Sequence, residues 1–194
     1  LRSSHDIREL DLYWSNAVGI FKAQVLPFLL KKKDRWRLVA LVPGYLENPR
    51  SSLISMLNAF INAGIFAAGS LVTADSERVR SVLHHSDDQE GGTLLFGVSF
   101  ALLDLAAGMH LGRDELVILE TGGMKTDKRS VSRQEMLSAL KSAFPSSVVI
   151  SEYGMTELLS QAYSKGEGVF CCPPWMKILI REMNDPKQLV PYGI

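Results

Sequence analysis

Residues 93–120, TLLFGVSFALLDLAAGMHLGRDELVILE, decide the fold class of this chain. The short apolar runs at 93–98 and 116–120 are typical of buried strands, and residues 100–107 between them predict a helix. A buried strand followed by a helix and a second buried strand is the unit that builds parallel sheets. We therefore expect an α/β fold with a mostly parallel sheet that is flanked by helices.

The same alternation continues on both sides of this unit. Helix boundaries are marked by a capping serine at Ser51 or Ser52, by Gly64, and by a capping box at Ser132 and Glu135. Further strands are expected at 38–42, 65–68 and 148–151, and a β-rich run at 175–181. Helices are expected at 8–30 (kinked or ended by Pro27), 51–63, 75–83, 132–141 and 156–163.

Composition excludes several classes of protein. The chain has 194 residues, of which 46% are hydrophobic, and its 21 Lys and Arg balance its 21 Asp and Glu, so no basic field favours nucleic acid. No apolar run approaches the ~20 residues that a membrane-spanning helix needs. The two cysteines, Cys171 and Cys172, are neighbours, and a bridge between them would be strained. We expect a buried structural pair of thiols in a cytoplasmic protein.

Ligands of parallel α/β sheets bind beyond the carboxyl ends of the strands. Four segments fall at this edge: residues 43–45, Ser99, residues 121–124 and residues 152–157. In 121–124 two adjacent glycines remove the side chains where a flat ligand could lie against the backbone, although a plain loop would look the same. Two such segments at one edge favour a nucleotide site.

Residues 151–157 carry the strongest chemical signal. The predicted helix start would offer free N–H groups to an anion, and the hydroxyl of Thr156 could bind a phosphate oxygen. The carboxylate of Glu157 suits Mg²⁺, Tyr153 offers a flat face to a base, and Gly154 allows a sharp turn. A helix cap at Thr156, with Glu157 complementing the helix dipole, explains the same residues without a ligand.

Longer motifs give these segments a context. The stretches ETGGMK at 120–125, SEYGMTELLSQAY at 151–163 and PPWMK at 173–177, with LFGVSFALLD at 95–104, resemble the acyl-protein synthetase family. That family includes the fatty-acid-activating subunit of the bacterial bioluminescence fatty acid reductase, and it is similar to the wider acyl-adenylate-forming superfamily. The resemblance covers most of the chain and implies the large domain of an adenylate-forming enzyme.

The resemblance implies a role for each motif residue. Tyr153 would stack on the adenine of ATP or AMP, Thr156 would hold the α-phosphate as a catalytic residue, and Glu157 would bind Mg²⁺. The remaining contacts to the nucleotide would come from Gly122, Gly123, Met124, Gly154 and Met155, and from Ser3 and Ser4 as the remnant of a phosphate-binding loop. Tyr45 and Ser99 would border the acyl pocket.

The implied reaction is the ATP-dependent activation of a fatty acid to acyl-AMP, followed by acyl transfer to a protein cysteine, with a fatty acid reductase as partner. Residues 1–194 would be one nucleotide-binding lobe of a longer chain, with a β-rich subdomain starting at 169–194. The phosphate loop before His5 and, after Ile194, the ribose-binding aspartate, catalytic lysine, acyl-accepting cysteine and carboxy-terminal subdomain would then be missing. An acyl- or aryl-CoA ligase and a non-catalytic nucleotide-binding module are the alternatives.

Overall fold

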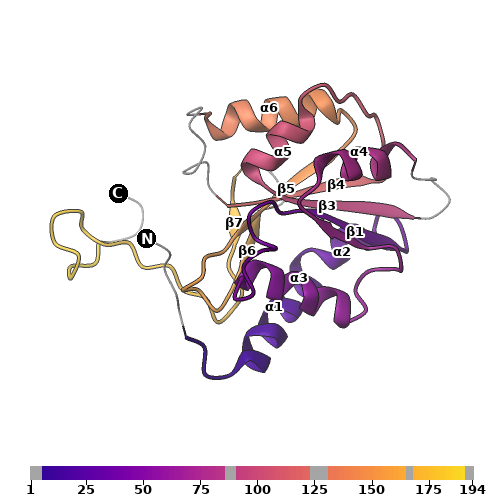
Figure 1. Cartoon of the computed structure of the whole chain (residues 1–194). Helices are drawn as coiled ribbons and strands as arrows, with labels where there is room; N and C mark the ends of the chain where they lie inside the picture. Colours follow the sequence, from indigo (N-terminus) through magenta and orange to yellow (C-terminus); the bar gives the residue numbers. More distant parts are fainter. Residues whose placement is uncertain (1–5, 86–90, 123–130, 165–167, 191–194) are drawn as a thin grey trace.

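A single mixed sheet of seven strands, flanked by helices, forms the centre of the molecule (Figure 1). The computed structural model describes residues 6–85, 91–122, 131–164 and 168–190. The strand order is β2-β1-β3-β4-β5-β6-β7. The strands are β1 (Trp36–Leu41), β2 (Leu71–Thr73), β3 (Gly92–Val98), β4 (Leu116–Thr121), β5 (Val148–Tyr153), β6 (Ala162–Ser164) and β7 (Phe170–Cys171).

The first five strands of this order run parallel, which confirms the parallel part of the predicted sheet. Every residue of β3 and β4 is buried, as expected for strands that are covered on both faces and therefore read as continuous apolar runs. The strands expected at 38–42, 93–98, 116–120 and 148–151 are present with small shifts of their ends. β6 and β7 are antiparallel, so the sheet is mixed.

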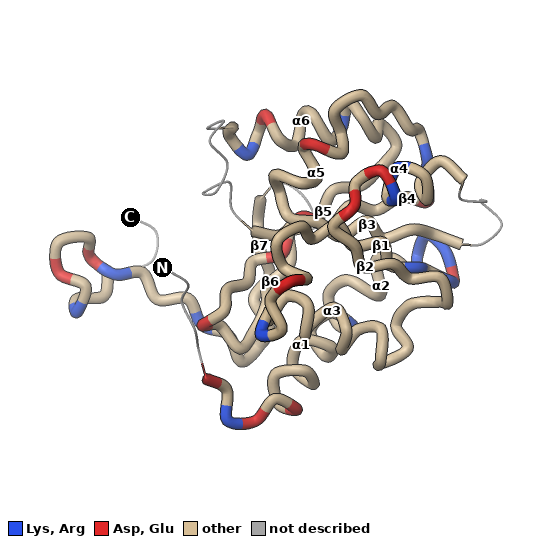
Figure 2. The backbone as a smooth tube through the Cα atoms, viewed as in Figure 1, with Lys and Arg blue, Asp and Glu red and all other residues tan. Residues whose placement is uncertain are grey.

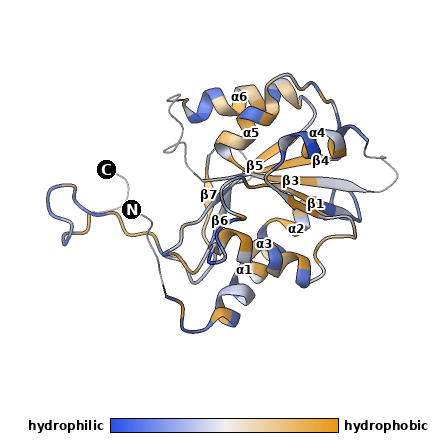
Figure 3. Cartoon of the chain, viewed as in Figure 1, coloured by the Kyte–Doolittle hydropathy of each residue, from blue (hydrophilic) through white to orange (hydrophobic). Residues whose placement is uncertain are grey.

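Two layers of helices cover the two faces of the sheet (Figures 1 and 3). The first layer contains α1 (Leu10–Gln24), α2 (Leu26–Leu30) and α3 (Ser52–Asn62), and the second contains α4 (Ser76–His84), α5 (Ser99–Ala106) and α6 (Arg133–Ala143). Side chains alternate along each strand, so Leu94 and Phe96 of β3 pack under the first layer while Leu95 packs under the second. Each face of the sheet therefore has its own apolar core.

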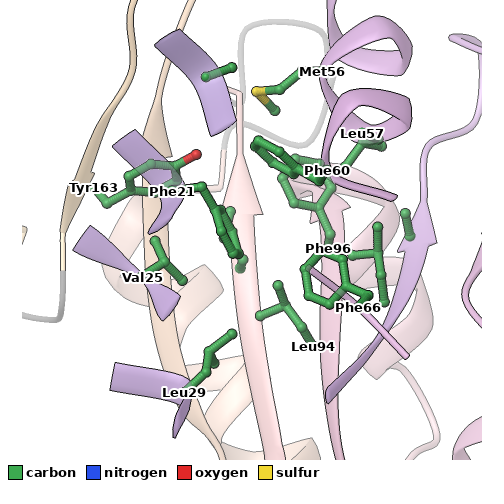
Figure 4. Packing of buried hydrophobic residues seen from close by; sticks show 14 of the residues in the cluster. Phe21, Val25, Leu29, Met56, Leu57, Phe60, Phe66, Leu94, Phe96 and Tyr163 are labelled. Atoms are coloured by element: carbon green, nitrogen blue, oxygen red, sulfur yellow. The ribbon is translucent and has the colours of Figure 1, made fainter. Parts of the chain in front are cut away.

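Aromatic rings fill the core beneath the first layer (Figure 4). Phe21 of α1 lies 4.6 Å from Phe60 of α3, 5.7 Å from Phe66 and 6.0 Å from Tyr163 of β6, measured between ring centroids. Three of these rings belong to segments far apart in the sequence, so their packing fixes α1 and β6 against the same part of the sheet.

The predicted helix caps are present. Ser51, and not Ser52, caps α3 by accepting a hydrogen bond of 3.2 Å from the N–H of Ile54. Ser132 and Glu135 form the expected capping box at the start of α6, with hydrogen bonds of 3.2 and 2.8 Å. Gly64 follows the end of α3 with φ of +66°, a conformation that glycine adopts without strain.

The first half confirms one predicted break and corrects one predicted strand. The helix expected over residues 8–30, kinked or ended by Pro27, is two helices that meet at Val25, because Pro27 has no N–H to continue the hydrogen bonds of α1. Residues 65–68 do not form a strand: the N–H of Ala67 makes one bond of 2.7 Å to the carbonyl of Trp36, and pairing with β1 starts only at β2. A turn at Gly69, with φ of +88°, separates the two.

The helix expected over residues 156–163 is wrong. The chain makes a turn in which the N–H of Leu158 donates to the carbonyl of Met155 at 3.1 Å, and then enters β6. In β6 Tyr163 pairs with Glu152 of β5 and its ring enters the first-layer core. This long-range pairing overrides the local helical pattern.

The tail also departs from the prediction. Residues 175–181 contain no strand. In the described tail, β-pairing is limited to an isolated antiparallel bridge between Arg181 and Leu189. Figure 1 shows this segment reaching away from the sheet. Cys171 and Cys172 are exposed free thiols and not the buried pair that was expected. Among the described residues, no helix combines the length and apolar character that crossing a membrane requires.

Candidate functional site

A pocket of about 130 Å³ opens at the carboxyl ends of the parallel strands. It lies between the first helix layer and the ends of β4 and β5. It brings together five residues that the sequence singled out: Tyr45, Gly122, Gly154, Met155 and Thr156. The other described lining residues are Tyr13, Ser52, Leu53, Met56, Val98, Thr121, Glu152 and Gln161. The expectation that the separate segments meet at one sheet edge is therefore confirmed for these five.

The pocket is small for a complete ligand. Small-molecule sites commonly enclose ~300–1,000 Å³, so the described walls surround a chemical group and not a whole nucleotide or fatty acid. Beside Gly122 the described backbone is open: φ is +80°, and a Cβ placed there would have no neighbour within 4 Å among the described residues. This open backbone surface fits the flat ligand that the sequence predicts at the glycine pair.

Glu152 is the charged residue of the pocket wall. It lies on β5 in the position that points into the first layer, and it is 8% exposed. The hydroxyl of Thr121 on the neighbouring strand donates a hydrogen bond to its carboxylate. Burial, and to a smaller extent the nearby Glu120, raises the pKa of Glu152 to about 7, while the bond from Thr121 opposes the shift.

Gly154 is required by this carboxylate. A Cβ at position 154 would overlap the Glu152 side chain. The glycine of the turn therefore makes room for Glu152, in addition to allowing the sharp turn that the sequence suggested. Its absent side chain lets the backbone at Gly154 approach the carboxylate closely.

Further polar groups surround Glu152. The hydroxyl of Tyr13 donates to the carbonyl of Ser52 at 3.2 Å, and burial raises the pKa of Tyr13 to about 12. Burial also raises the pKa of Tyr163 well above its usual value, and the charge of Glu152 adds to this shift. Within the described chain, the Oε1 atom of Gln161 and the hydroxyl of Tyr163 are buried without a hydrogen-bond partner.

The opposite face of the same edge holds a second polar group of residues. The hydroxyl of Ser99 lies 2.7 Å from both Oε1 of Glu120 and the carbonyl of Gly122, so its hydrogen is shared between them. Ser99 is 2% exposed and does not line the pocket. Its position at the start of α5 instead ties the turn after β4 to the strand, which holds Gly122 in place.

Tyr153 belongs to this second group because it points away from Glu152. Its ring is 40% exposed and packs edge-on against Phe170, with centroids 6.0 Å apart and planes at 63°. The guanidinium of Arg133 lies 5.9 Å from the centre of the Phe170 ring, donates to the hydroxyl of Ser151 at 2.7 Å, and pairs with Glu120 at 3.8 Å. The sheet edge therefore separates Tyr153 from the pocket.

Thr156 and Glu157 do not begin a helix. They lie in the turn after β5, so the N–H groups and dipole of a helix start are not available to a phosphate there. Glu157 is exposed, and the described residues contain no group of three His, Cys, Asp or Glu side chains that could hold a metal. The predicted contacts of Ser3, Ser4, Gly123 and Met124 lie outside the described residues.

Sequence reasoning placed Glu152 at the ligand-binding edge without giving it a role, and it missed Gln161 and Arg133. For Glu152 a signal existed, because it lies two residues after the buried Ile150 and therefore faces the same core. Gln161 was hidden inside a stretch that was assigned to a helix. Arg133 was noted only as part of a capping box, and its reach to Ser151 depends on how α6 packs on the sheet.

Figure 2 shows Asp and Glu interspersed with Lys and Arg along the described backbone. This agrees with the balanced composition of the chain. Comparison of the chain with protein-family models gave no match, and no curated protein matches it. The resemblance to the acyl-protein synthetases therefore rests on the quoted motifs alone.

Proposed function

We propose that this chain binds ATP and activates a fatty acid as acyl-AMP for transfer to a protein cysteine. The observation that carries the proposal is the meeting of Tyr45, Gly122 and residues 154–156 around one pocket at the carboxyl edge of a parallel sheet. This is the edge at which α/β sheets bind ligands. The three segments are also those that the family resemblance assigns to the acyl group, the nucleotide base and the phosphate.

The nucleotide would lie across the sheet edge. Its base would rest on the open backbone at Gly122 and against the exposed ring of Tyr153, on the side of the second helix layer. The hydroxyl of Thr156, which lines the pocket, would bind the α-phosphate. Ser99 would act indirectly, because its hydrogen bond to the Gly122 carbonyl holds the surface on which the base rests.

Mg²⁺ fits the exposed carboxylate of Glu157. This cation is commonly held by one or two carboxylates together with the phosphates of the substrate, so a cluster of three protein ligands is not required. Bound there, it would neutralise charge on the phosphates. Glu157 would hold the metal and Thr156 would orient the phosphate, which are positioning and electrostatic roles.

The acid would enter on the other side of the edge. Leu53, Met56 and Val98 give the pocket an apolar wall, and Tyr45 stands at its rim. The carboxylate end of the acid would lie near Thr156, where the α-phosphate is expected. The fatty chain would extend beyond the described walls, since about 130 Å³ holds only a small part of it.

The direct test is fatty-acid-dependent exchange of labelled pyrophosphate into ATP by the purified full-length protein. We expect exchange with the unmodified protein and a loss of at least 100-fold in Glu157→Gln, because the amide is a poor ligand for Mg²⁺. Glu47→Gln, an exposed carboxylate on the loop after β1, is the matched control and should keep full exchange. Exchange by Glu157→Gln at the unmodified rate would remove Glu157 from the site.

The acyl acceptor is decided by a second measurement. Acyl transfer to a cysteine of the protein or of its reductase partner would appear as label that hydroxylamine releases from the polypeptide. A CoA-dependent acyl thioester in solution would instead assign an acyl- or aryl-CoA ligase. Cys171 and Cys172 are exposed free thiols, so a double replacement by serine serves as a control for incidental acylation.

One observation favours a nucleotide-binding module without catalysis. The turn at Thr156 and Glu157 lacks the helix start that would strengthen phosphate binding. Such a module would bind ATP, as measured by calorimetry, without any pyrophosphate exchange. Absence of both ATP binding and exchange would overturn the proposed function in either form.

A further inference from the structure

At its inner end, the part of the pocket wall formed by the described residues contains hydrogen-bond acceptors and no cation. Glu152 and Gln161 are both lining residues of the pocket, and Gln161 is 3% exposed. Within the described chain, the Oε1 atom of Gln161 has no hydrogen-bond partner. None of the described lining residues is Lys, Arg or His. A buried carboxylate without a counter-ion is unfavourable, as is a buried acceptor without a donor.

The pocket also limits the size of what could supply the missing donor. The described walls enclose about 130 Å³, well below the ~300–1,000 Å³ of common small-molecule sites, which favours a small group. The apolar side chains of Leu53, Met56 and Val98 line another part of the wall. A group that combines a short carbon chain with a positively charged donor matches both parts of the wall.

We propose that the inner end of the pocket binds the ammonium group of a small primary amine, with Glu152 as its counter-ion and Gln161 as a second acceptor. An ammonium group carries three donors and one positive charge, so it has a counter-charge for Glu152 and a further donor for Gln161. One carboxylate oxygen already accepts a hydrogen bond from Thr121, which orients the carboxylate.

Other titratable groups near Glu152 leave this pairing intact between pH 6 and 8. Tyr13 of α1 and Tyr163 of β6 stay neutral in this range, because burial raises the pKa of both. Glu120 of β4 points into the second layer, where it pairs with Arg133. The lining residues of α3 (Ser52, Leu53 and Met56) do not titrate.

This inference does not depend on the proposed function, because amine binding requires neither ATP nor catalysis. If the acid of the proposed reaction occupies the same pocket, its carboxylate lies at Thr156 and its amino group lies at Glu152. The activated acid would then be an amino-substituted one. Loss of pyrophosphate exchange with retained amine binding would overturn the proposed function alone, and the reverse result would overturn this inference alone.

The test is a titration of the protein with propylamine and with 1-propanol, a neutral molecule of nearly equal size. Binding is followed by NMR, using the side-chain amide signals of Gln161 as the local probe. We expect propylammonium to bind at least tenfold more tightly than 1-propanol at pH 8. Its affinity should fall about tenfold at pH 6, since the Glu152 carboxyl, with a pKa of about 7, is mostly neutral there. The amine itself stays charged at both pH values, like a lysine with a pKa of ~10.4.

Glu152→Gln should lose at least tenfold in amine affinity at pH 8 and should show no change with pH. Glu47→Gln is the control for general surface charge and should change the affinity less than twofold. Equal binding of amine and alcohol, affinity that does not change with pH in the unmodified chain, or full amine binding by Glu152→Gln would each overturn the inference. The pH series on the unmodified protein keeps the test decisive even if the variant does not fold.

Discussion

Burial of Glu152 beneath Gly154 gives the chain a carboxyl group that changes charge near neutral pH. The carboxyl is held by one hydrogen bond, from Thr121, and has no described cation beside it. The unfavourable desolvation of the charged carboxylate therefore exceeds the stabilisation from its hydrogen bond to Thr121. For this reason the pKa of Glu152 is raised to about 7. Protonation of Glu152 consequently affects both the charge of the pocket and the stability of the fold.

This group makes stability depend on pH. The pKa of Glu152 rises from 4.5 to about 7 on folding, so the folded state holds the proton longer than the unfolded state does. Stability is full below pH 4.5, falls between pH 4.5 and 7, and stays level above. The total loss is about 3 kcal/mol for a shift of this size.

Glu152→Gln should remove that loss, since the amide does not titrate. We compare the free energy of unfolding of the variant with that of the unmodified chain at each pH. We expect this difference to shift in favour of the variant by about 3 kcal/mol as the pH rises from 4.5 to 8. Urea unfolding of both proteins at several pH values measures the difference, in which the shared titrations of other groups cancel. A difference that stays constant across this range would show that Glu152 has the same pKa in both states.

At the scale of the elements, local sequence signals were sufficient to predict a helix start whose backbone N–H groups are hydrogen-bonded by side chains of the same helix. The capping box at Ser132 and Glu135 fixes the start of α6, and hydrogen bonds from Ser132 lower the pKa of Glu135. Both residues can be read from four consecutive positions of the sequence. The cap thus places α6, and with it the Arg133 side chain that reaches Ser151.

Ser132→Ala should therefore destabilise the protein by about 1 kcal/mol, the usual cost of losing a side-chain cap. Ser138→Ala in the exposed middle of the same helix is the matched control, and it should leave stability unchanged or raise it by a few tenths of a kcal/mol. Thermal and urea unfolding of the two variants provide the measurement. Equal effects of the two substitutions would mean that the cap contributes nothing.

Elements that depend on distant partners were predicted poorly. The parallel strands are buried on both faces and appear as apolar runs, so their positions follow from the sequence. β6 is three residues long, and it exists because Tyr163 pairs with Glu152 and packs on Phe21. Neither contact has a local signature, and the helix expected there was wrong for this reason. The pocket wall at Gln161 was missed with it.

In the candidate site, too, residues with a local sequence signal were predicted and residues that depend on distant contacts were not. Tyr45, Gly122 and Gly154 were found from turns that follow apolar runs, and they do meet. The carboxylate of Glu152 in the pocket depends on which face of β5 points to the first helix layer and on the small side chain at position 154. The partners of Ser99 depend on the pairing of β3 with β4. Register and packing, which a single sequence specifies only indirectly, decide these contacts.

At the scale of the whole molecule, the chain consists of a packed body and an extended tail. The buried hydrophobic residues of the described chain end at Tyr163, and residues 174–189 are exposed or partly exposed. Trp175 and Met183 are 58% and 89% exposed. A segment with so few buried contacts opens at almost no cost in free energy.

Limited digestion with trypsin should therefore cut first in the tail, at Lys177, Arg181 and Lys187, all of which are exposed. The remaining body should unfold at the same temperature as the intact chain, because both apolar cores lie outside the tail. Mass spectrometry of the early fragments and thermal unfolding of the product give the two readouts. The Lys31–Lys33 segment after α2 is the internal comparison: it is also accessible, but it is held by backbone hydrogen bonds to α2 and by the pair of Lys33 with Glu115 at 3.3 Å. First cleavage there, or a lower unfolding temperature of the trimmed body, would show that the tail stabilises the sheet.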